Sequence, residues 1–162
     1  MGLADDLLIL AGHLADPSTN HPEQAWLRRS VSTSYYALIH LLVGDAVQCW
    51  NGSVAARVGL ERAFGRDNMY KVSQAVSKGS WRGWSDPSPP VPAELKSVAK
   101  AFVSLQEERR QADYNNARVW AQTEVKTQLD IAQAAFRNWR KIETGAAANE
   151  YSLSLLVGRK RD

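Results

Sequence analysis

Two rows of polar side chains on otherwise apolar helical segments hold the residue types in this sequence best suited to chemistry. At about 100° per residue, the first row falls within roughly 60° of the helix circumference, and it consists of Arg29, Thr33, Tyr36 and His40. An arginine can bind phosphate through its planar fork, and an imidazole can transfer protons near neutral pH. The row predicts either a polar seam that binds a ligand or meets another helix, or a hydrogen-bonded network inside the core.

The second row lies near the end of a later helix. The apolar stripe of segment 98–105 continues through Arg109 and, slightly off the stripe, Asp113. Residues four apart can pair within a helix, but Arg before Asp is the less favourable order for the helix dipole. This arrangement suggests a role other than helix stability. The alternative is an ion pair that orders the helix end and the turn at 115–116.

Helical periodicity through almost the whole chain predicts an all-α fold, a four- to five-helix bundle. We expect helices ending near residue 15, then over about 22–50, 53–64 with a short continuation past 67, 92–114 and 123–142. Segment 79–92 has four prolines and two tryptophans, and we interpret it as a functional lid or a packed surface loop. The expected organisation is a helical bundle over 1–145 and a C-terminal tail over 146–162.

Composition narrows the class of protein. The chain has 162 residues, of which 44% are hydrophobic and 23% charged, with a formal net charge of +3. These values argue against disorder, and no apolar run approaches the length of a membrane span. The acidic N-terminus lacks the basic region of a signal peptide, so we expect a cytoplasmic protein without membrane contact. The single cysteine, Cys49, can form neither an internal disulfide nor a zinc site by itself, and we expect no metal or cofactor.

Both polar rows lie in stretches that resemble the HEPN domain family (higher eukaryotes and prokaryotes nucleotide-binding). The stretch 28–40, RRSVSTSYYALIH, resembles the second-helix signature of an Arg, a small polar residue, Tyr-Tyr-Ala and a His one turn later. The stretch 105–114, LQEERRQADY, resembles the Arg-x-x-Ala-Asp-Tyr ending of the fourth helix in one large branch. The resemblance covers roughly residues 4 to 143.

The resemblance implies a helical bundle that dimerises, with the motif-bearing helices meeting at the interface. Many family members are metal-independent endoribonucleases, in which Arg and His of an Arg-x4–6-His motif converge on the RNA. The 2′-hydroxyl then attacks the adjacent phosphate, while Arg neutralises charge and His moves protons. Other members are toxins paired with a minimal nucleotidyltransferase antitoxin, or bind nucleotides or RNA without cutting.

This sequence departs from the nuclease pattern at one position. Five residues after Arg109 stands Tyr114 instead of His, and no histidine follows His40. A proton shuttle would therefore have to be His40, reaching across from the earlier helix. We expect His40 and Arg109 to be the catalytic candidates, and the ligand-binding candidates to be Arg29, Thr33, Tyr36, Arg110, Asp113 and Tyr114.

Three functions remain open from the sequence. The first is a homodimeric HEPN-like domain that binds RNA or a nucleotide with a degenerate nuclease motif, for which the resemblance also implies a nucleotidyltransferase as a candidate partner. The second is a metal-independent endoribonuclease, acting as a toxin or defence component. The third is a helical protein-interaction module whose polar seam only fixes the dimer register. Trp81 and Trp84, with Arg82 between them, could stack bases or cover an open end of the bundle.

Overall fold

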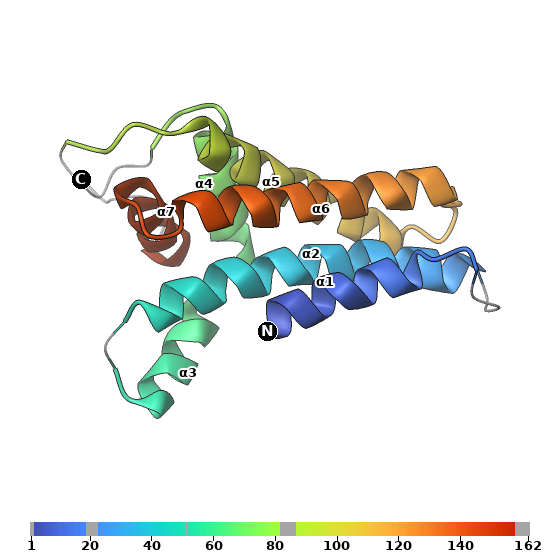
Figure 1. Cartoon of the computed structure of the whole chain (residues 1–162), viewed down its shortest axis with the longest axis horizontal. Coiled ribbons are helices and arrows are strands. Elements are labelled where there is room, and N and C mark those ends of the chain that lie inside the picture. The colour runs from blue at the N-terminus through green and yellow to red at the C-terminus, as the bar shows by residue number, and fades with distance from the viewer. Residues whose placement is uncertain (1, 19–22, 51, 82–86, 158–162) are drawn as a thin grey trace. The chain divides into compact units, whose positions relative to one another are not determined.

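A computed structural model describes residues 2–18, 23–50, 52–81 and 87–157 of the chain, and these residues form α-helices with no strand (Figure 1). The predicted all-α class is confirmed. The seven helices of the described residues are α1 (Leu3–Leu14), α2 (Glu23–Gln48), α3 (Val54–Ala63), α4 (Arg66–Ser77), α5 (Ala93–Tyr114), α6 (Gln122–Ile142) and α7 (Ala146–Val157).

Local sequence signals explain several of these boundaries. Ser53 begins α3, because its hydroxyl accepts a hydrogen bond from the Ala56 N–H at 3.2 Å, as an N-cap does. Gly79, with φ of 82°, follows the end of α4 in the left-handed conformation that glycine tolerates best. The expected helix over about 22–50 is α2, and the expected long helix over 92–114 is α5.

The segment that we expected to be a C-terminal tail is largely helical. Residues 146–157 form α7, and Ala148, Tyr151 and Leu155 are buried along one side of it. Their spacing of three and four residues is that of an amphipathic helix. The described part of the chain therefore holds two helices more than the expected five, because α4 is a separate element and the chain turns at Gly145 into α7.

The chain divides into two compact units. Unit 1 comprises Met1–Leu41 and Ser104–Phe136, and unit 2 comprises Leu42–Val103 and Arg137–Asp162. The boundaries between the units fall inside α2, α5 and α6.

Unit 1 is a four-helix bundle built from α1 and from the parts of α2, α5 and α6 that belong to it. One cluster of its core joins the four, and its buried members are Ala15, Leu27, Val31, Ala112, Trp120 and Val125. The Ser30 hydroxyl of α2 donates to the Ala11 carbonyl of α1 at 2.8 Å. Small side chains at such positions let α1 and α2 approach closely, which fixes the α2 face turned toward α5.

In unit 2, α4 packs against α7. The Asn68 amide donates to the carbonyls of Ser154 at 3.2 Å and Leu155 at 2.8 Å. The hydroxyls of Ser73 and Tyr151 lie 2.7 Å apart in the core. Burial raises the pKa of Tyr151 although the hydrogen bond with Ser73 lowers it, so this phenol is neutral across the physiological range.

Candidate functional site

The sequence-predicted polar residues of α2 and α5 meet inside unit 1, where the two helices run antiparallel. Tyr36 of α2 contacts Arg109 of α5, and Ser32, one turn earlier in α2, contacts Asp113, one turn later in α5. The Ser32 hydroxyl donates to Oδ1 of Asp113. Successive turns of one helix therefore match successive turns of the other along this seam.

Arg109 is the centre of the seam. Its Nη2 donates to the Tyr36 hydroxyl at 2.9 Å, and its Nε lies 2.9 Å from Oδ2 of Asp113. The predicted pair of Arg109 and Asp113 is thus confirmed. The Nε–H is not aligned on a hydrogen-bond acceptor, so this contact is a close ion pair without good hydrogen-bond geometry. Only 12% of the Arg109 side chain is exposed.

Three aromatic rings surround the Arg109 guanidinium. Its Cζ lies 5.8 Å from the ring centre of Tyr35, and 5.6 Å from those of Tyr36 and Tyr114. These distances are within the range of cation–π attraction. Tyr35 is fully buried, whereas Tyr114 is 74% exposed. The guanidinium is therefore held between a buried aromatic wall and an aromatic side chain that reaches solvent.

The environment keeps Arg109 charged. Partial burial lowers the pKa of Arg109. The hydrogen bond with Tyr36 and the electrostatic attraction of Tyr36, Asp113 and Tyr114 raise this pKa by more than burial lowers it, so the net shift is upward. A guanidinium in this setting is a fixed cation at any physiological pH. It can bind or stabilise an anion, and it cannot act as a proton shuttle.

Arg28 organises the end of α5, a role that the sequence did not reveal. Its Nη1 donates to the carbonyls of Ala112 at 2.9 Å and Asn115 at 3.0 Å. Its Nη2 donates to the carbonyls of Asn116 at 3.4 Å and of Arg118. The last carbonyls of a helix have no partner within the helix, and Arg28 supplies one for Ala112 and binds three carbonyls of the loop that follows α5. This contact, together with the Arg109 pair, places Tyr114.

Three residues of α2 at a spacing of four, Arg28, Ser32 and Tyr36, bond to α5, and Tyr35 also reaches it by donating to Oε1 of Gln106 at 3.3 Å. Two of our candidates lie beside this row instead of on it. Arg29 is exposed and Thr33 is buried, and none of the hydrogen bonds or ion pairs between described residues links either to Arg109 or Asp113. Packed helices that cross at an angle touch along a ridge of residues four apart, which drifts around the helix. The row predicted from the helical wheel runs parallel to the helix axis, and it therefore departs from the contact ridge at Arg29 and Thr33.

His40 and Arg110 lie beside the cluster in the sequence of α2 and α5. His40 lies one turn beyond Tyr36 on α2, about 6 Å further along the axis, and is half-buried. Between described residues, no hydrogen bond or ion pair connects it with Arg109. Arg110 is exposed next to Arg109. The structure therefore brings together Tyr36, Arg109, Asp113 and Tyr114, which we call the Arg109 cluster.

The loop after α5 is fixed by a second arginine that sequence reasoning overlooked. Nη1 of Arg118 lies 2.8 Å from Oε2 of Glu108, and its Cζ lies 3.8 Å from the ring centre of Trp120. Gln24 of α2 both accepts from the Trp120 N–H and donates to the Trp120 carbonyl, each at 2.9 Å. The sequence signal for this contact was the presence of Arg118 and Trp120, two positions apart, in the short loop between α5 and α6.

The aromatic loop is described only in part. Trp81 is half-buried, and its Nε1 donates to the Pro89 carbonyl at 2.5 Å. This bond favours the packed-loop interpretation for Trp81. Arg82 and Trp84 lie outside the described residues, as does the basic segment 159–161.

Within the described part of the chain, no cluster of three or more His, Cys, Asp or Glu side chains has the arrangement of a metal site. No described helix combines the length and apolarity needed to cross a membrane. Comparisons with models of known protein families, with curated proteins and with solved structures found no match to this chain.

Proposed function

We propose that this protein is a HEPN-like helical domain that binds RNA or a nucleotide through the Arg109 cluster, as a homodimer and without efficient catalysis. The observation that carries the proposal is the setting of Arg109, a charged guanidinium held among three tyrosines, one of them largely exposed. A phosphate and a base need neighbouring partners of these two kinds, a cation and an aromatic face.

The guanidinium retains one nitrogen, Nη1, whose donors are open to a ligand. Nη2 is engaged by Tyr36 and Nε by Asp113, whereas Nη1 has no hydrogen-bond partner among the described residues. Nη1 is not one of the described buried side-chain atoms that lack a hydrogen-bond partner, so it is not sealed inside the core. A phosphate oxygen could therefore accept from Nη1 while the other two nitrogens keep the fork in position.

Tyr114 supports the same proposal from the position where the nuclease pattern has histidine. A phenol is a much poorer proton acceptor than an imidazole, so this substitution favours binding over cleavage. Its exposed ring is suited to stack on a base, an interaction worth about 1–3 kcal/mol. Arg109 on its inner side limits the ring's freedom before any ligand arrives.

The charge around the cluster is balanced. Arg109 and Arg110 stand close in sequence to Glu107, Glu108 and Asp113. Non-specific attraction to nucleic acid therefore contributes little, and affinity has to come from a few directed contacts. We expect moderate affinity that falls as salt increases.

A second candidate function has an observation of its own. Arg109 is only 12% exposed and is bonded to Tyr36 and Asp113, which is also what a structural network requires. In that case the chain is a helical interaction module, and the cluster fixes how α2 and α5 fit together. A metal-independent endoribonuclease is the third candidate, and it requires His40 to reach the phosphate held by Arg109.

One binding experiment separates the first two candidates. A short fluorescein-labelled single-stranded RNA is titrated with wild type, Arg109→Ala, Arg110→Ala and Tyr114→Ala, with anisotropy as the readout. Arg137→Ala is the matched control, because Arg137 is an exposed helical arginine of unit 2 that takes no part in the cluster. Circular dichroism and sedimentation report helicity and oligomeric state for each variant.

We expect Arg109→Ala and Tyr114→Ala to weaken binding about tenfold, roughly 1.4 kcal/mol, and Arg137→Ala to leave it unchanged. Equal affinity in all variants, or no binding by wild type, would reject the proposal and leave the interaction module. Incubation of the same RNA with wild type in EDTA tests the third candidate. Cleavage that disappears in His40→Ala would replace the binding proposal with the nuclease.

A further inference from the structure

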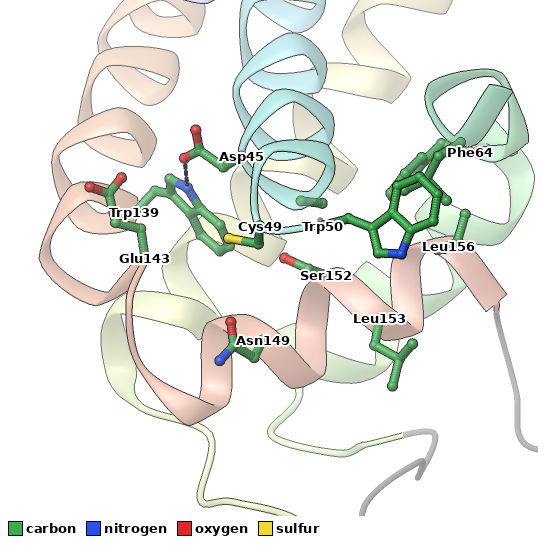
Figure 2. Close-up of a pocket in the computed structure, with 12 residues that line it drawn as sticks. Asp45, Cys49, Trp50, Phe64, Trp139, Glu143, Asn149, Ser152, Leu153 and Leu156 are labelled. Carbon is green, nitrogen blue, oxygen red and sulfur yellow. Dashed lines mark hydrogen bonds between the residues drawn. The ribbon is translucent and has the colours of Figure 1, made fainter. Parts of the chain in front are cut away.

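Unit 2 contains a cavity of about 380 Å³ that is separate from the Arg109 cluster (Figure 2). It lies among the C-terminal ends of α2 and α6, helix α3 with Phe64, and α7. Its volume falls within the range of small-molecule sites. One part of its wall is apolar and is formed by Trp50, Leu60, Phe64, Leu153 and Leu156.

The opposite part of the wall carries two carboxylates, Asp45 and Glu143, beside Trp139 (Figure 2). Oδ2 of Asp45 accepts a hydrogen bond from Trp139 Nε1 at 2.7 Å. Nη1 of Arg140 lies 3.7 Å from the same oxygen and 3.1 Å from Oε2 of Glu143. One arginine outside the wall therefore faces two carboxylates within it.

Arg140 supplies one positive charge for the two carboxyl groups, so acidic groups are in excess at this end of the cavity. Burial raises the pKa of Asp45, the Trp139 hydrogen bond and Arg140 lower it, and Glu143 raises it again, so the net shift is upward. Burial is the largest of these effects. No lysine or arginine is among the described residues that line the cavity.

We propose that this cavity binds a small organic amine with a hydrophobic body, its ammonium group directed at Asp45 and Glu143 and its body packed among Trp50, Phe64 and Leu153. The carboxylates supply the charge complement, and their contact with a cation in a partly dry site is stronger than the same contact in water. An anion of the same shape would meet two like charges. The proposal is independent of the function assigned to unit 1.

Cys49 makes the cavity directly observable. It is the single cysteine of the chain, it is exposed, and it belongs to the cavity wall between the polar and apolar parts (Figure 2). A molecule in the cavity therefore restricts access to this thiol. The rate at which a thiol-reactive aromatic disulfide modifies the protein then measures occupancy, without interference from another thiol.

The test compares three probes of similar shape and different charge: phenethylamine, phenethyl alcohol and hydrocinnamate. Each is titrated against the full chain while the rate of Cys49 modification is recorded. We expect the amine to protect Cys49 at a concentration about tenfold lower than the alcohol, and hydrocinnamate to protect least. Asp45→Asn and Glu143→Gln should reduce the advantage of the amine and leave protection by the alcohol unchanged.

Two controls distinguish the cavity from general effects of charge and folding. Glu61→Gln removes a carboxylate from exposed α3 outside the cavity wall, and it should keep the full preference for the amine. Asparagine at position 45 can still accept from Trp139, so the packing of that indole is retained. Leu153→Trp fills the apolar part and should abolish protection by both amine and alcohol.

Several results would overturn the proposal. Equal protection by amine and anion would show that the carboxylates do not select the ligand. An unchanged amine preference in Asp45→Asn and Glu143→Gln would do the same. Absence of protection by any of the three probes, in wild type of native helicity, would show that the cavity does not bind this class of molecule.

Discussion

The Tyr36 hydroxyl accepts a hydrogen bond at 2.9 Å from Nη2 of Arg109, a residue 73 positions later in the chain. The bond joins the middle of α2 to the end of α5, while Asp113 pairs with Nε of the same guanidinium. It holds the fork in a single orientation. Both candidate roles for Arg109, ligand binding and helix registration, depend on that orientation.

Tyr36→Phe tests the strength of this bond. The variant keeps the ring near the guanidinium and removes only the acceptor, which leaves a poorly solvated donor unsatisfied. We expect a loss of about 1 kcal/mol in the free energy of unfolding, measured by urea denaturation. Tyr114→Phe is the matched control, because that side chain is 74% exposed and should change stability little. A similar effect of both variants would contradict the interpretation.

Neighbouring arginines at the start of α2 should differ sharply in their effect on stability. Arg28→Ala leaves the carbonyls of Ala112, Asn115 and Arg118 without their donor, and we expect it to cost about 2–3 kcal/mol. Arg29→Ala removes an equal charge from an exposed position and should stay within about 0.5 kcal/mol of wild type. Urea unfolding of both variants provides the measurement, and comparable losses would show that Arg28 does not anchor α5.

The upward pKa shift of Asp45 predicts a pH-dependent effect of Asp45→Asn. The folded state holds the Asp45 proton more tightly than the unfolded chain, so this residue lowers stability progressively as pH rises from its ordinary value of 3.8 through the raised one. The variant lacks this titration. Its free energy of unfolding relative to wild type should therefore increase between about pH 3 and about pH 6.5.

Urea unfolding of the two proteins at both pH values gives the comparison. A stability difference that stays constant, or one that falls as pH rises, would contradict the assigned direction. The sign of the change with pH is the test, because the absolute difference also contains the lost attraction between Asp45 and Arg140.

Two glycines should respond to alanine in opposite directions. Gly59 lies inside α3 with open space where a Cβ would be, so Gly59→Ala should stabilise by about 0.5–1 kcal/mol. Gly79 has φ of 82°, and an added Cβ would lie 3.1 Å from Cε of Lys96. Gly79→Ala should therefore destabilise by about 1 kcal/mol. Thermal unfolding followed by circular dichroism measures both, and a gain from Gly79→Ala would be contrary to this account.

A further glycine shapes the proposed amine cavity. A Cβ on Gly52 would lie 2.2 Å from Cζ3 of Trp50, whose side chain is 45% exposed and forms part of the cavity wall. Gly52→Ala should displace the indole outward, because a partly exposed side chain moves more easily than backbone. We expect altered tryptophan fluorescence and a changed rate of Cys49 modification. Unchanged values of both would show that the indole does not rest on Gly52.

Local spacing was enough to predict the elements and some of the site. Helical periodicity, the prolines before α2 and α5, and the glycines near helix ends predicted the bounds of α2, α5 and α6 to within about two residues. The pair of Arg109 and Asp113 was also predicted, because both residues belong to one helix and their spacing is set by its geometry. These features depend on interactions between residues near in sequence.

The tertiary structure decided which residues of α2 face α5. A helical wheel places Arg29 and Thr33 near Tyr36, yet the crossing of two helices selects the drifting row of Arg28, Ser32 and Tyr36. It also decided that the last apolar segment packs as α7, and it assembled the cavity from residues up to 111 positions apart, Asp45 and Leu156 among them. Such contacts depend on how side chains fill shared space, which the spacing within any one helix does not specify.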